Sequence, residues 1–367
     1  MNKKVILGVA AIALIALLGW YFYANKGTES RKQETVKIGV ILPLSGDVAS
    51  YGIDSRDGIL YAIEELYQDK ATVIFEDSKG EPKTAVTAYN KLVNMDKVNF
   101  VIGDLFSNTT LAIAPLANQK KNLLISPTAS TQDIPKNGIY SLSVYPSETF
   151  ESELVAKFIN SKYKTTAVLY EKVAAAQVMS DVFVQNSNIK ISFVEGFASD
   201  TPDFSNILLK LKNSGAESVY LVTYTNNGIK ILDKMKTLNM KTNIVGPSSL
   251  FDPSLYDYLK EAKFDFHLTG PSFDANSDEA IMRSFSDKFV AKYSKLPNQM
   301  AFQGYIAVSV ANDFYTQINE GTYTEDYLRK YNKQILGKTF SFSSTLTSQL
   351  GLTLYKFENG EFRILTE

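Results

Sequence analysis

Short apolar runs alternate with amphipathic segments along almost the whole chain, and this alternation restricts the fold more than any other feature. The runs are rich in β-branched residues, as in VKIGVIL at 36–42. The segments between them repeat their apolar residues with helical spacing, as in DSRDGILYAIEELY at 54–67. Strand, helix and strand in this order form right-handed crossovers, which build a parallel sheet covered by helices on both faces. The sequence therefore predicts an α/β fold.

The alternation forms two successive blocks, which end near residues 144 and 271. The last third of the chain differs, because the segments at 278–295 and 300–321 predict two long helices with no strand between them. A helical pair without its own sheet has to pack on a sheet that is already built. We therefore predict two lobes, with the chain crossing back to the first lobe in its last third.

The composition excludes several classes of function. The chain has 367 residues with no cysteine and one histidine, His267, which rules out disulfides and thiolate or histidine-rich metal sites. Lysine and arginine number 38 against 39 aspartates and glutamates, so no net field attracts nucleic acid. The GxSxG, P-loop and GxGxxG patterns are missing as well. We predict a binding protein that is not an enzyme and needs no cofactor or metal.

The first 24 residues differ from the rest. Two lysines precede VILGVAAIALIALLGWYFY at 5–23, an uncharged run of 19 residues that is long enough to cross a bilayer. The positive start predicts that the chain after this run is exported. Phe22 and Ala24 fit the small-residue positions of a cleavage site poorly, which favours an uncleaved anchor over a cleaved signal peptide. Residues 25–35 are polar and without periodicity, so they are predicted to form a linker.

Small hydroxyl residues follow three strands of the first block. IGDLFSNTT contains Ser107, LLISPTAST contains Thr128 and Ser130, and PLSGDVASYG contains Ser45 and Tyr51. In an open parallel sheet, ligands bind beyond the carboxyl ends of the strands, where helix starts offer free N–H groups and a partial positive charge. Taken alone, the first of these segments is better explained by a helix N-cap. The three together predict a site for a small anion such as a carboxylate.

These segments, in their order and spacing, resemble the type I periplasmic binding proteins, in particular the branched-chain amino-acid-binding proteins of ABC importers. The resemblance runs from VKIGVILPLSGDVASYGIDSRDGILYAIEEL through FEDSKGEPKTAVTAYNKLV, FVIGDLFSNTT and LLISPTAST to TPDFSNILLKLKNSGAESVYLVTYTNNG and TNIVGPSSLFD. It covers nearly everything after residue 35. It implies two α/β lobes, each a mostly parallel sheet with helices on both faces, joined by a three-strand hinge that closes on the ligand.

The resemblance places the crossings between the lobes near residues 145–147, 269–272 and 339–344. Lobe 1 is then expected to consist of residues 36–146 and 272–340. Lobe 2 is expected to consist of residues 147–271 and 341–367.

The resemblance also implies roles for individual residues. The ligand carboxylate is expected in the first lobe, at the Ser107 hydroxyl, the Thr128 backbone and the Ser130 hydroxyl. Tyr51 matches an aromatic wall of the side-chain pocket, and Tyr224 matches a second-lobe aromatic that closes on the ligand. Each lobe thus supplies contacts, which is what differential binding to a closed state requires.

Two departures from the family leave the chemical class of the ligand open. Ser248 stands where the amino-acid binders carry an acidic residue for the ligand ammonium, and an unpaired buried ammonium costs several kcal/mol. Either another acid supplies the charge, with Glu171 as a candidate, or the ligand has a carboxylate and no ammonium. Ala175 replaces a second aromatic residue and indicates a roomier pocket.

The resemblance implies an exported, membrane-tethered solute-binding protein that captures a small carboxylate-bearing ligand and hands it to an ABC permease. A receptor that senses the ligand and signals to a membrane partner without transport is the alternative. An enzyme on the same fold would need a catalytic constellation that the sequence lacks.

Overall fold

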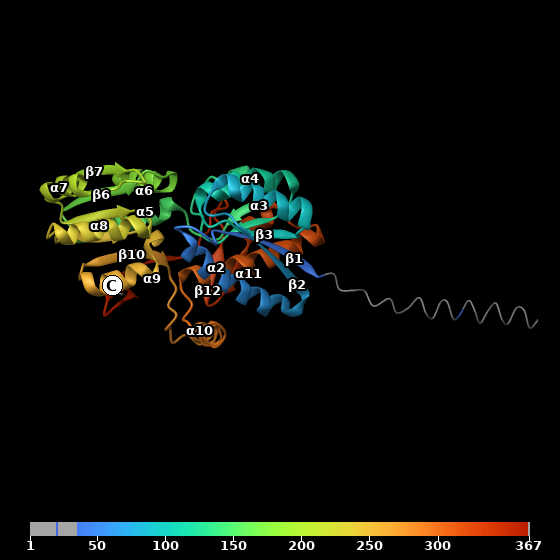
Figure 1. Ribbon diagram of the computed structural model, residues 1–367. Helices are drawn as coiled ribbons and strands as arrows, with labels where there is room; N and C mark the ends of the chain where they lie inside the picture. The colour runs from blue at the N-terminus through green and yellow to red at the C-terminus, as the bar shows by residue number, and fades with distance from the viewer. Residues whose placement is uncertain (1–19, 21–34, 366–367) are drawn as a thin grey trace, which may run out of the picture.

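Two α/β lobes lie side by side in the computed structural model of the chain, as predicted (Figure 1). The structure describes Trp20 and residues 35–365. The anchor or signal peptide predicted for residues 1–24 and the linker predicted for 25–35 therefore fall almost entirely outside the described residues. Within the described part, no helix combines the length and the apolar character needed to cross a membrane.

The first lobe is built on a five-stranded sheet with strand order β2-β1-β3-β4-β5, in which all neighbouring strands are parallel. Its strands are β1 (Val36–Leu42), β2 (Ala71–Asp77), β3 (Phe100–Gly103), β4 (Leu124–Ser126) and β5 (Ser141–Ser143). The helices between them are α2 (Ala49–Tyr67), α3 (Pro82–Asn90) and α4 (Ser107–Lys120). Because the strands are parallel, the loops after β1, β3 and β4 leave the sheet at the same edge.

Two long helices from the last third of the chain pack on the first lobe, as the sequence predicts. They are α10 (Ala280–Tyr293) and α11 (Gln299–Glu320). Helix α11 is buried along most of its length and packs beside α2 (Figure 1). Phe302 and Phe314 of α11 are fully buried in the same core cluster as Ile38 and Val40 of β1. Segments far apart in the sequence therefore share one core.

The second lobe has a seven-stranded sheet with strand order β14-β13-β10-β9-β8-β6-β7. Its strands are β6 (Thr165–Glu171), β7 (Lys190–Phe197), β8 (Ser218–Val222), β9 (Asn243–Gly246), β10 (Phe266–Pro271), β13 (Leu352–Glu358) and β14 (Glu361–Ile364). Its helices are α5 (Glu148–Lys162), α6 (Ala174–Asn186), α7 (Ser205–Asn213), α8 (Thr225–Thr237) and α9 (Pro253–Ala262). Strands β6 to β10 pair in parallel, and β13 and β14 add an antiparallel edge.

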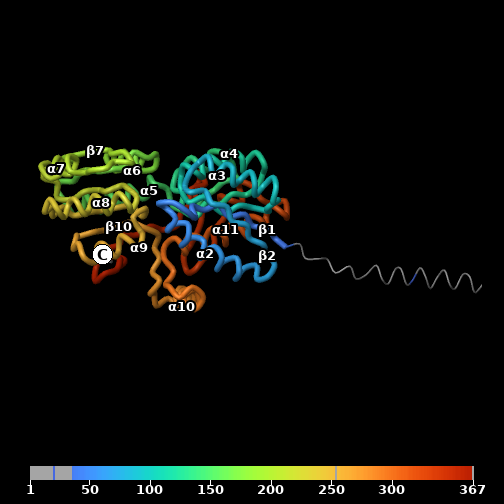
Figure 2. Tube along the Cα trace, in the orientation of Figure 1, coloured from blue at the N-terminus to red at the C-terminus, as the bar shows by residue number. Residues whose placement is uncertain are grey.

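Three segments run between the two lobes that the chain trace in Figure 2 shows side by side. Hydrogen bonds join these segments to one another. The hydroxyl of Ser348 donates to the carbonyl oxygen of Val144 at 2.8 Å. The backbone N–H of Ser272 donates to the carbonyl oxygen of Gly351 at 3.1 Å. The connection between the lobes is therefore a set of three interacting chain segments.

The third segment leaves the first lobe later in the chain than the predicted 339–344. Residues 339–341 belong to β12 (Lys338–Ser341), which pairs with β11 (Asn332–Ile335) in a two-stranded sheet. Phe342 and Leu350 are buried in the core of the first lobe. These apolar contacts hold the chain on the first lobe almost as far as the start of β13.

Helices α2 and α11 approach each other closely because both carry glycine at the contact. A Cβ atom on Gly58 would lie 1.9 Å from the carbonyl oxygen of Ala301, and one on Gly304 would lie 2.5 Å from the carbonyl oxygen of Ser55. Both distances are well below the separation of non-bonded atoms in contact. The contact fixes the position of α2, whose first turn faces the second lobe.

We expect Gly58→Ala to lower the free energy of unfolding by about 1–3 kcal/mol, because the added methyl group forces apart two packed backbones. Gly351→Ala is the matched control, since a Cβ atom there meets nothing within 4 Å. Urea unfolding followed by circular dichroism measures both variants. Equal midpoints for the two would contradict the packing argument.

Candidate functional site

A cavity of about 90 Å³ lies between the two lobes. All six residues predicted as ligand contacts line it. Tyr51, Ser107, Thr128 and Ser130 come from the first lobe, and Tyr224 and Ser248 come from the second. The fold thus brings the predicted residues together, and their contact with a ligand stays a prediction.

The first-lobe wall combines the start of a helix with hydroxyl groups. Ser107 is the first residue of α4, where the backbone N–H groups have no partner within the helix. The hydroxyl of Thr128 donates to the carbonyl oxygen of Leu105 at 2.8 Å, so the Thr128 backbone is the part that can serve a ligand. The carbonyl oxygen of Ser130 accepts a hydrogen bond from the N–H of Glu148 at 3.1 Å. This wall presents hydrogen-bond donors suited to a carboxylate.

Ser45, the other hydroxyl residue singled out at a strand end, does not line the cavity. Its hydroxyl donates to Oδ2 of Asp77 at 2.5 Å, and the N–H of Leu44 donates to Oδ1 of the same carboxylate at 2.8 Å. Asp77 is the last residue of β2. Ser45 therefore stabilises the loop after β1, and Tyr51 is the residue that this loop region contributes to the cavity.

Three aromatic rings from both lobes meet beside the hydroxyl wall. Phe106 packs edge-on against Tyr51, with ring centroids 6.2 Å apart, and edge-on against Tyr224, with centroids 5.6 Å apart. Burial raises the pKa of Tyr224 to about 12 and raises the pKa of Tyr51 further still, so both phenols stay neutral at physiological pH. Sequence reasoning missed Phe106, although it stands next to Ser107 in the quoted IGDLFSNTT segment.

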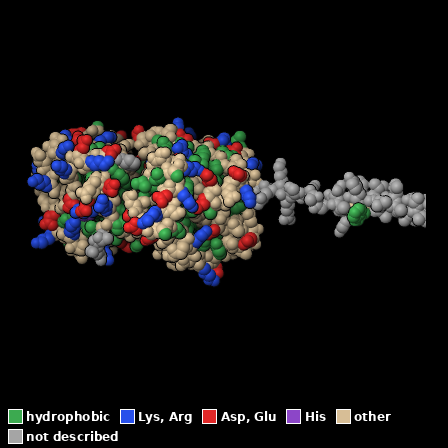
Figure 3. All heavy atoms as spheres, turned by 90° about the horizontal axis from the view of Figure 1, so that it is seen from below, with side chains coloured by type: hydrophobic (Ala, Val, Ile, Leu, Met, Phe, Trp, Pro, Cys, Tyr) green, Lys and Arg blue, Asp and Glu red, His purple; other side chains and the backbone are tan. Residues whose placement is uncertain are grey.

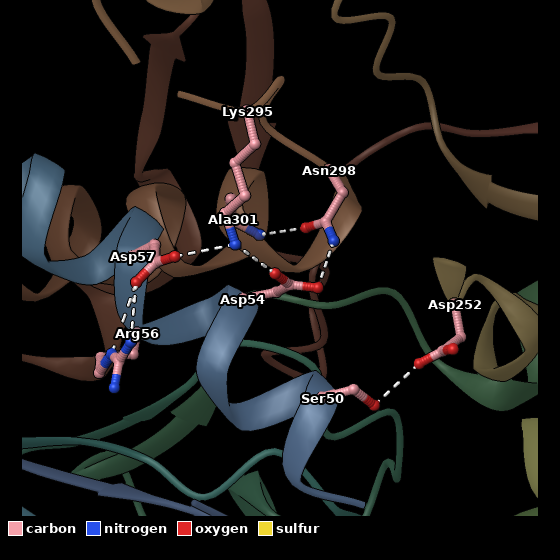
Figure 4. A network of polar contacts seen from close by, with 8 residues as sticks. All are labelled: Ser50, Asp54, Arg56, Asp57, Asp252, Lys295, Asn298 and Ala301. Carbon is pink, nitrogen blue, oxygen red and sulfur yellow. Dashed lines mark hydrogen bonds and ion pairs between the residues drawn. The ribbon is translucent and has the colours of Figure 1, made fainter. Parts of the chain in front are cut away.

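Polar contacts join the lobes across the cavity mouth. The hydroxyl of Tyr51 lies 2.9 Å from Oγ1 of Thr225 and donates to the carbonyl oxygen of Ser249 at 2.9 Å. The hydroxyl of Ser50 donates to Oδ2 of Asp252 at 2.8 Å (Figure 4). These contacts start from the first turn of α2, which begins at Ala49 rather than at residue 54 as predicted. The structure is therefore a closed conformation, with the two lobes in contact.

A network behind this first turn anchors it to the first lobe (Figure 4). Asp54 of α2 forms an ion pair with Lys295 at 2.7 Å and accepts a hydrogen bond from Nδ2 of Asn298 at 2.6 Å. Lys295 also pairs with Asp57 at 2.9 Å. Asn298 caps α11 by accepting from the N–H of Ala301. Ser50 and Tyr51, which reach across the cleft, therefore belong to a helix that this network holds against the first lobe.

The second-lobe wall is mainly aliphatic. It is formed by Val173, Ala175, Ala176, Met179 and Val222. Ala175, whose small side chain predicts a roomier pocket, lies in this wall. Burial of an apolar ligand group against such a wall contributes about 25 cal/mol for each Å² removed from water.

Glu171, the acid proposed to replace the missing charge at Ser248, does not line the cavity. Its Oε2 accepts hydrogen bonds from the hydroxyl of Thr223 at 2.6 Å and from the N–H of Tyr224 at 3.3 Å. The carboxylate therefore holds the turn between β8 and α8. The proposal of Glu171 as the charge partner is not supported by its position.

A different carboxylate, Glu151, does line the cavity. It is fully buried in the first turn of α5, and burial raises the pKa of its carboxyl group. Its Oε1 accepts hydrogen bonds from the N–H of Ser248 at 2.7 Å and from the hydroxyl of Thr269 at 2.6 Å. Sequence reasoning missed Glu151, because an acidic residue in a first helical turn is expected for the helix dipole alone.

Comparison of the sequence with known families matches residues 35–329 to the family described as periplasmic binding protein. The chain is 28% identical over 312 residues to a leucine-, isoleucine-, valine-, threonine- and alanine-binding protein of Pseudomonas aeruginosa, with 81% of each chain covered. It is 26% identical over 345 residues to the Leu/Ile/Val-binding protein BraC3 of Rhizobium johnstonii, with 89% of this chain and 92% of the relative covered.

Solved structures show the same fold. A leucine-binding protein from Thermotoga maritima superposes with a TM-score of 0.82 at 20% identity, covering 90% of this chain and 98% of the other. A branched-chain amino acid transporter substrate-binding protein from Streptococcus pneumoniae, in complex with isoleucine, gives 0.81 at 21%, covering 90% and 99%. A solute-binding protein from Rhodopseudomonas palustris, in complex with benzoate, gives 0.81 at 17%, covering 90% and 95%.

The family match spans most of the chain, and the two-lobed fold with its cavity between the lobes agrees with it. The sequence resemblance stated above is therefore confirmed. The chain belongs to the periplasmic binding protein family, as a type I member of the kind represented by the branched-chain amino-acid-binding proteins.

Proposed function

We propose that this protein captures a small amino acid, or a related carboxylate, by closing its two lobes and delivers it to an ABC permease. The family consists of solute-binding proteins rather than enzymes, and its members work outside the cytoplasm. The observation that carries the proposal is the cavity itself. Helix-start and hydroxyl donors form one wall, aliphatic side chains form the opposite wall, and both lobes contribute.

The wall of alanine, valine and methionine side chains supports an aliphatic ligand group of modest size. The two relatives described above are named as amino-acid-binding proteins, and one structural neighbour is in complex with benzoate. A carboxylate is common to these ligands. Ser107, Thr128 and Ser130 are proposed to bind it, with Tyr51, Tyr224 and Ser248 around the rest of the ligand.

Charged side chains of both signs are interspersed over the face of the two lobes seen in Figure 3. Over its described residues, this face therefore lacks the basic patch that a nucleic acid requires, in agreement with the balance of 38 basic and 39 acidic residues. We further propose that the apolar run at 5–23 tethers the exported lobes to the membrane as an uncleaved anchor. The mature N-terminal sequence tests this point, since a start after Ala24 would show cleavage.

We expect Ser107→Ala combined with Ser130→Ala to weaken ligand binding at least about a hundredfold, because two hydrogen bonds to a charged carboxylate are lost. Thermal shift assays with leucine, isoleucine, valine, alanine and benzoate measure this loss of ligand binding. Ligand stabilisation should disappear, while the melting temperature without ligand stays within a few degrees, because these hydroxyls face the cavity and contribute little to the core.

Ser45→Ala is the matched control for this double variant, because its hydroxyl lies at the same sheet edge but donates to Asp77. It should keep the full ligand response. Undiminished stabilisation of the Ser107/Ser130 variant by the ligands of the native protein would remove the carboxylate-site assignment.

We expect Ser50→Ala to shift the ligand-free protein toward open conformations by at least about tenfold, because the loss of one hydrogen bond to a carboxylate across the cleft costs about 1.5–3 kcal/mol. The chain contains no cysteine, so one cysteine introduced on the exposed surface of each lobe accepts fluorescent dyes without background labelling. Energy transfer between the dyes reports the opening. Ser254→Ala, which removes a bond to Asp252 within the second lobe, is the control and should leave the distribution unchanged.

A further inference from the structure

Of the two carboxylate oxygens of Glu151, only Oε1 forms hydrogen bonds among the described residues. Its Oε1 accepts the hydrogen bonds from Ser248 and Thr269 described above. Its Oε2 is buried and has no hydrogen-bond partner within the described part of the chain. Because the two bonds to Oε1 fix the orientation of the carboxylate, Oε2 is left as an unused acceptor on a residue that lines the cavity.

A buried carboxylate with an unpaired oxygen is costly, and a positive charge within reach removes most of that cost. Among the described residues that line the cavity, none carries a positive charge. Tyr145, its neighbour in the lining, stays neutral because burial raises the pKa of its hydroxyl well above the ordinary value. The cation that would balance Glu151 therefore has to arrive with the ligand.

We propose that Glu151 binds the ammonium group of the ligand through Oε2, so that the protein selects an α-amino acid over a carboxylate that lacks the ammonium. The inference rests on the proposed function and narrows its ligand class. The donors at Ser107 and Ser130 receive the negative end of the ligand, and Glu151 receives the positive end. Both charges of a zwitterion are thereby matched inside one cavity.

Ser248 has a specific part in this arrangement. It occupies the position at which the resemblance leads one to expect the ammonium-binding acid. Its small side chain leaves space for the carboxylate that arrives from α5, and its N–H holds Oε1 of that carboxylate. The acid is thus supplied by the first helix of the second lobe instead of by the turn after β9. Ser248 acts as a positioning residue for Glu151.

A protonated Glu151 is the competing state, in which Oε2 would donate a hydrogen bond to an uncharged or anionic ligand group. Two observations favour the ionised form in the complex. Oε1 already accepts from two donors, an arrangement that stabilises the charged carboxylate. The first-lobe wall already provides donors for the ligand's anionic group, so a second donor on the far wall has no acceptor to serve in an aliphatic amino acid.

The test compares ligands that differ only in the ammonium group. Isothermal titration calorimetry of the native protein measures leucine, valine and alanine against 4-methylpentanoate, 3-methylbutanoate and propanoate. The matching amino acid should bind at least about thirtyfold more tightly than its counterpart without nitrogen, because that counterpart leaves the buried Glu151 unpaired. This comparison needs no variant and so does not depend on how any substitution folds.

Glu151→Gln should weaken amino-acid binding by at least about thirtyfold and leave binding of the carboxylate without nitrogen equal or stronger. Glu171→Gln is the matched control, since that carboxylate is also buried but lies outside the cavity. It should preserve the preference for the amino acid. The melting temperature of each ligand-free variant shows that it is folded.

Equal binding of both ligand series by the native protein, or equal weakening of both by Glu151→Gln, would overturn the role of Glu151 and leave the proposed carboxylate site intact. A preference for the ligands without nitrogen would also overturn it and would indicate a protonated Glu151. If the native protein binds none of the acids of either series, nor isoleucine, nor benzoate, the proposed function itself fails.

Discussion

The contact of the two lobes across the cavity governs the whole architecture, because the cavity has walls from both lobes and exists only when they close. The first turn of α2 makes the connection, through Tyr51 to Thr225 and Ser249 and through Ser50 to Asp252. That turn can reach the second lobe because α2 packs tightly on α11, where glycine stands on both sides of the contact. The return of the C-terminal helices to the first lobe is therefore part of how the binding site is built.

A ligand stabilises the closed state only to the extent that it interacts more strongly with two lobes than with one. The hydroxyl and helix-start groups lie on the first lobe, and Tyr224, the aliphatic wall and Glu151 lie on the second. A ligand that uses both sets bridges the cleft. Under the proposal, an amino acid bridges it with opposite charges, whereas a simple carboxylate would be held by one lobe and by apolar contacts only.

The sequence predicted those features that local periodicity and turn chemistry control. Helices α10 and α11 lie where the segments at 278–295 and 300–321 predict them, and the α/β class follows from the alternation of strands and helices. The order of the strand-end motifs indicated the family. The six residues chosen from these motifs and from the resemblance all line one cavity. The short α12 (Glu325–Lys330) and the strand β11 carry too few residues to show a period.

The remaining features depend on contacts between distant segments. The part of α2 before residue 54 lacks an amphipathic pattern. Its Ser50 and Tyr51 side chains form hydrogen bonds with the second lobe instead. Glu151 meets Ser248 and Thr269, which are 97 and 118 residues away in the chain, so no local pattern marks it. Phe106 gains its place between Tyr51 and Tyr224 only when the lobes meet.

A crystal structure of the protein with bound leucine would show which residues hold each charged group of the ligand. The account predicts that the ligand lies between the lobes, with its carboxylate at Ser107 and Ser130 and its ammonium within hydrogen-bond distance of Oε2 of Glu151. A ligand bound outside this cavity, or one turned so that its carboxylate faces Glu151, would contradict the account.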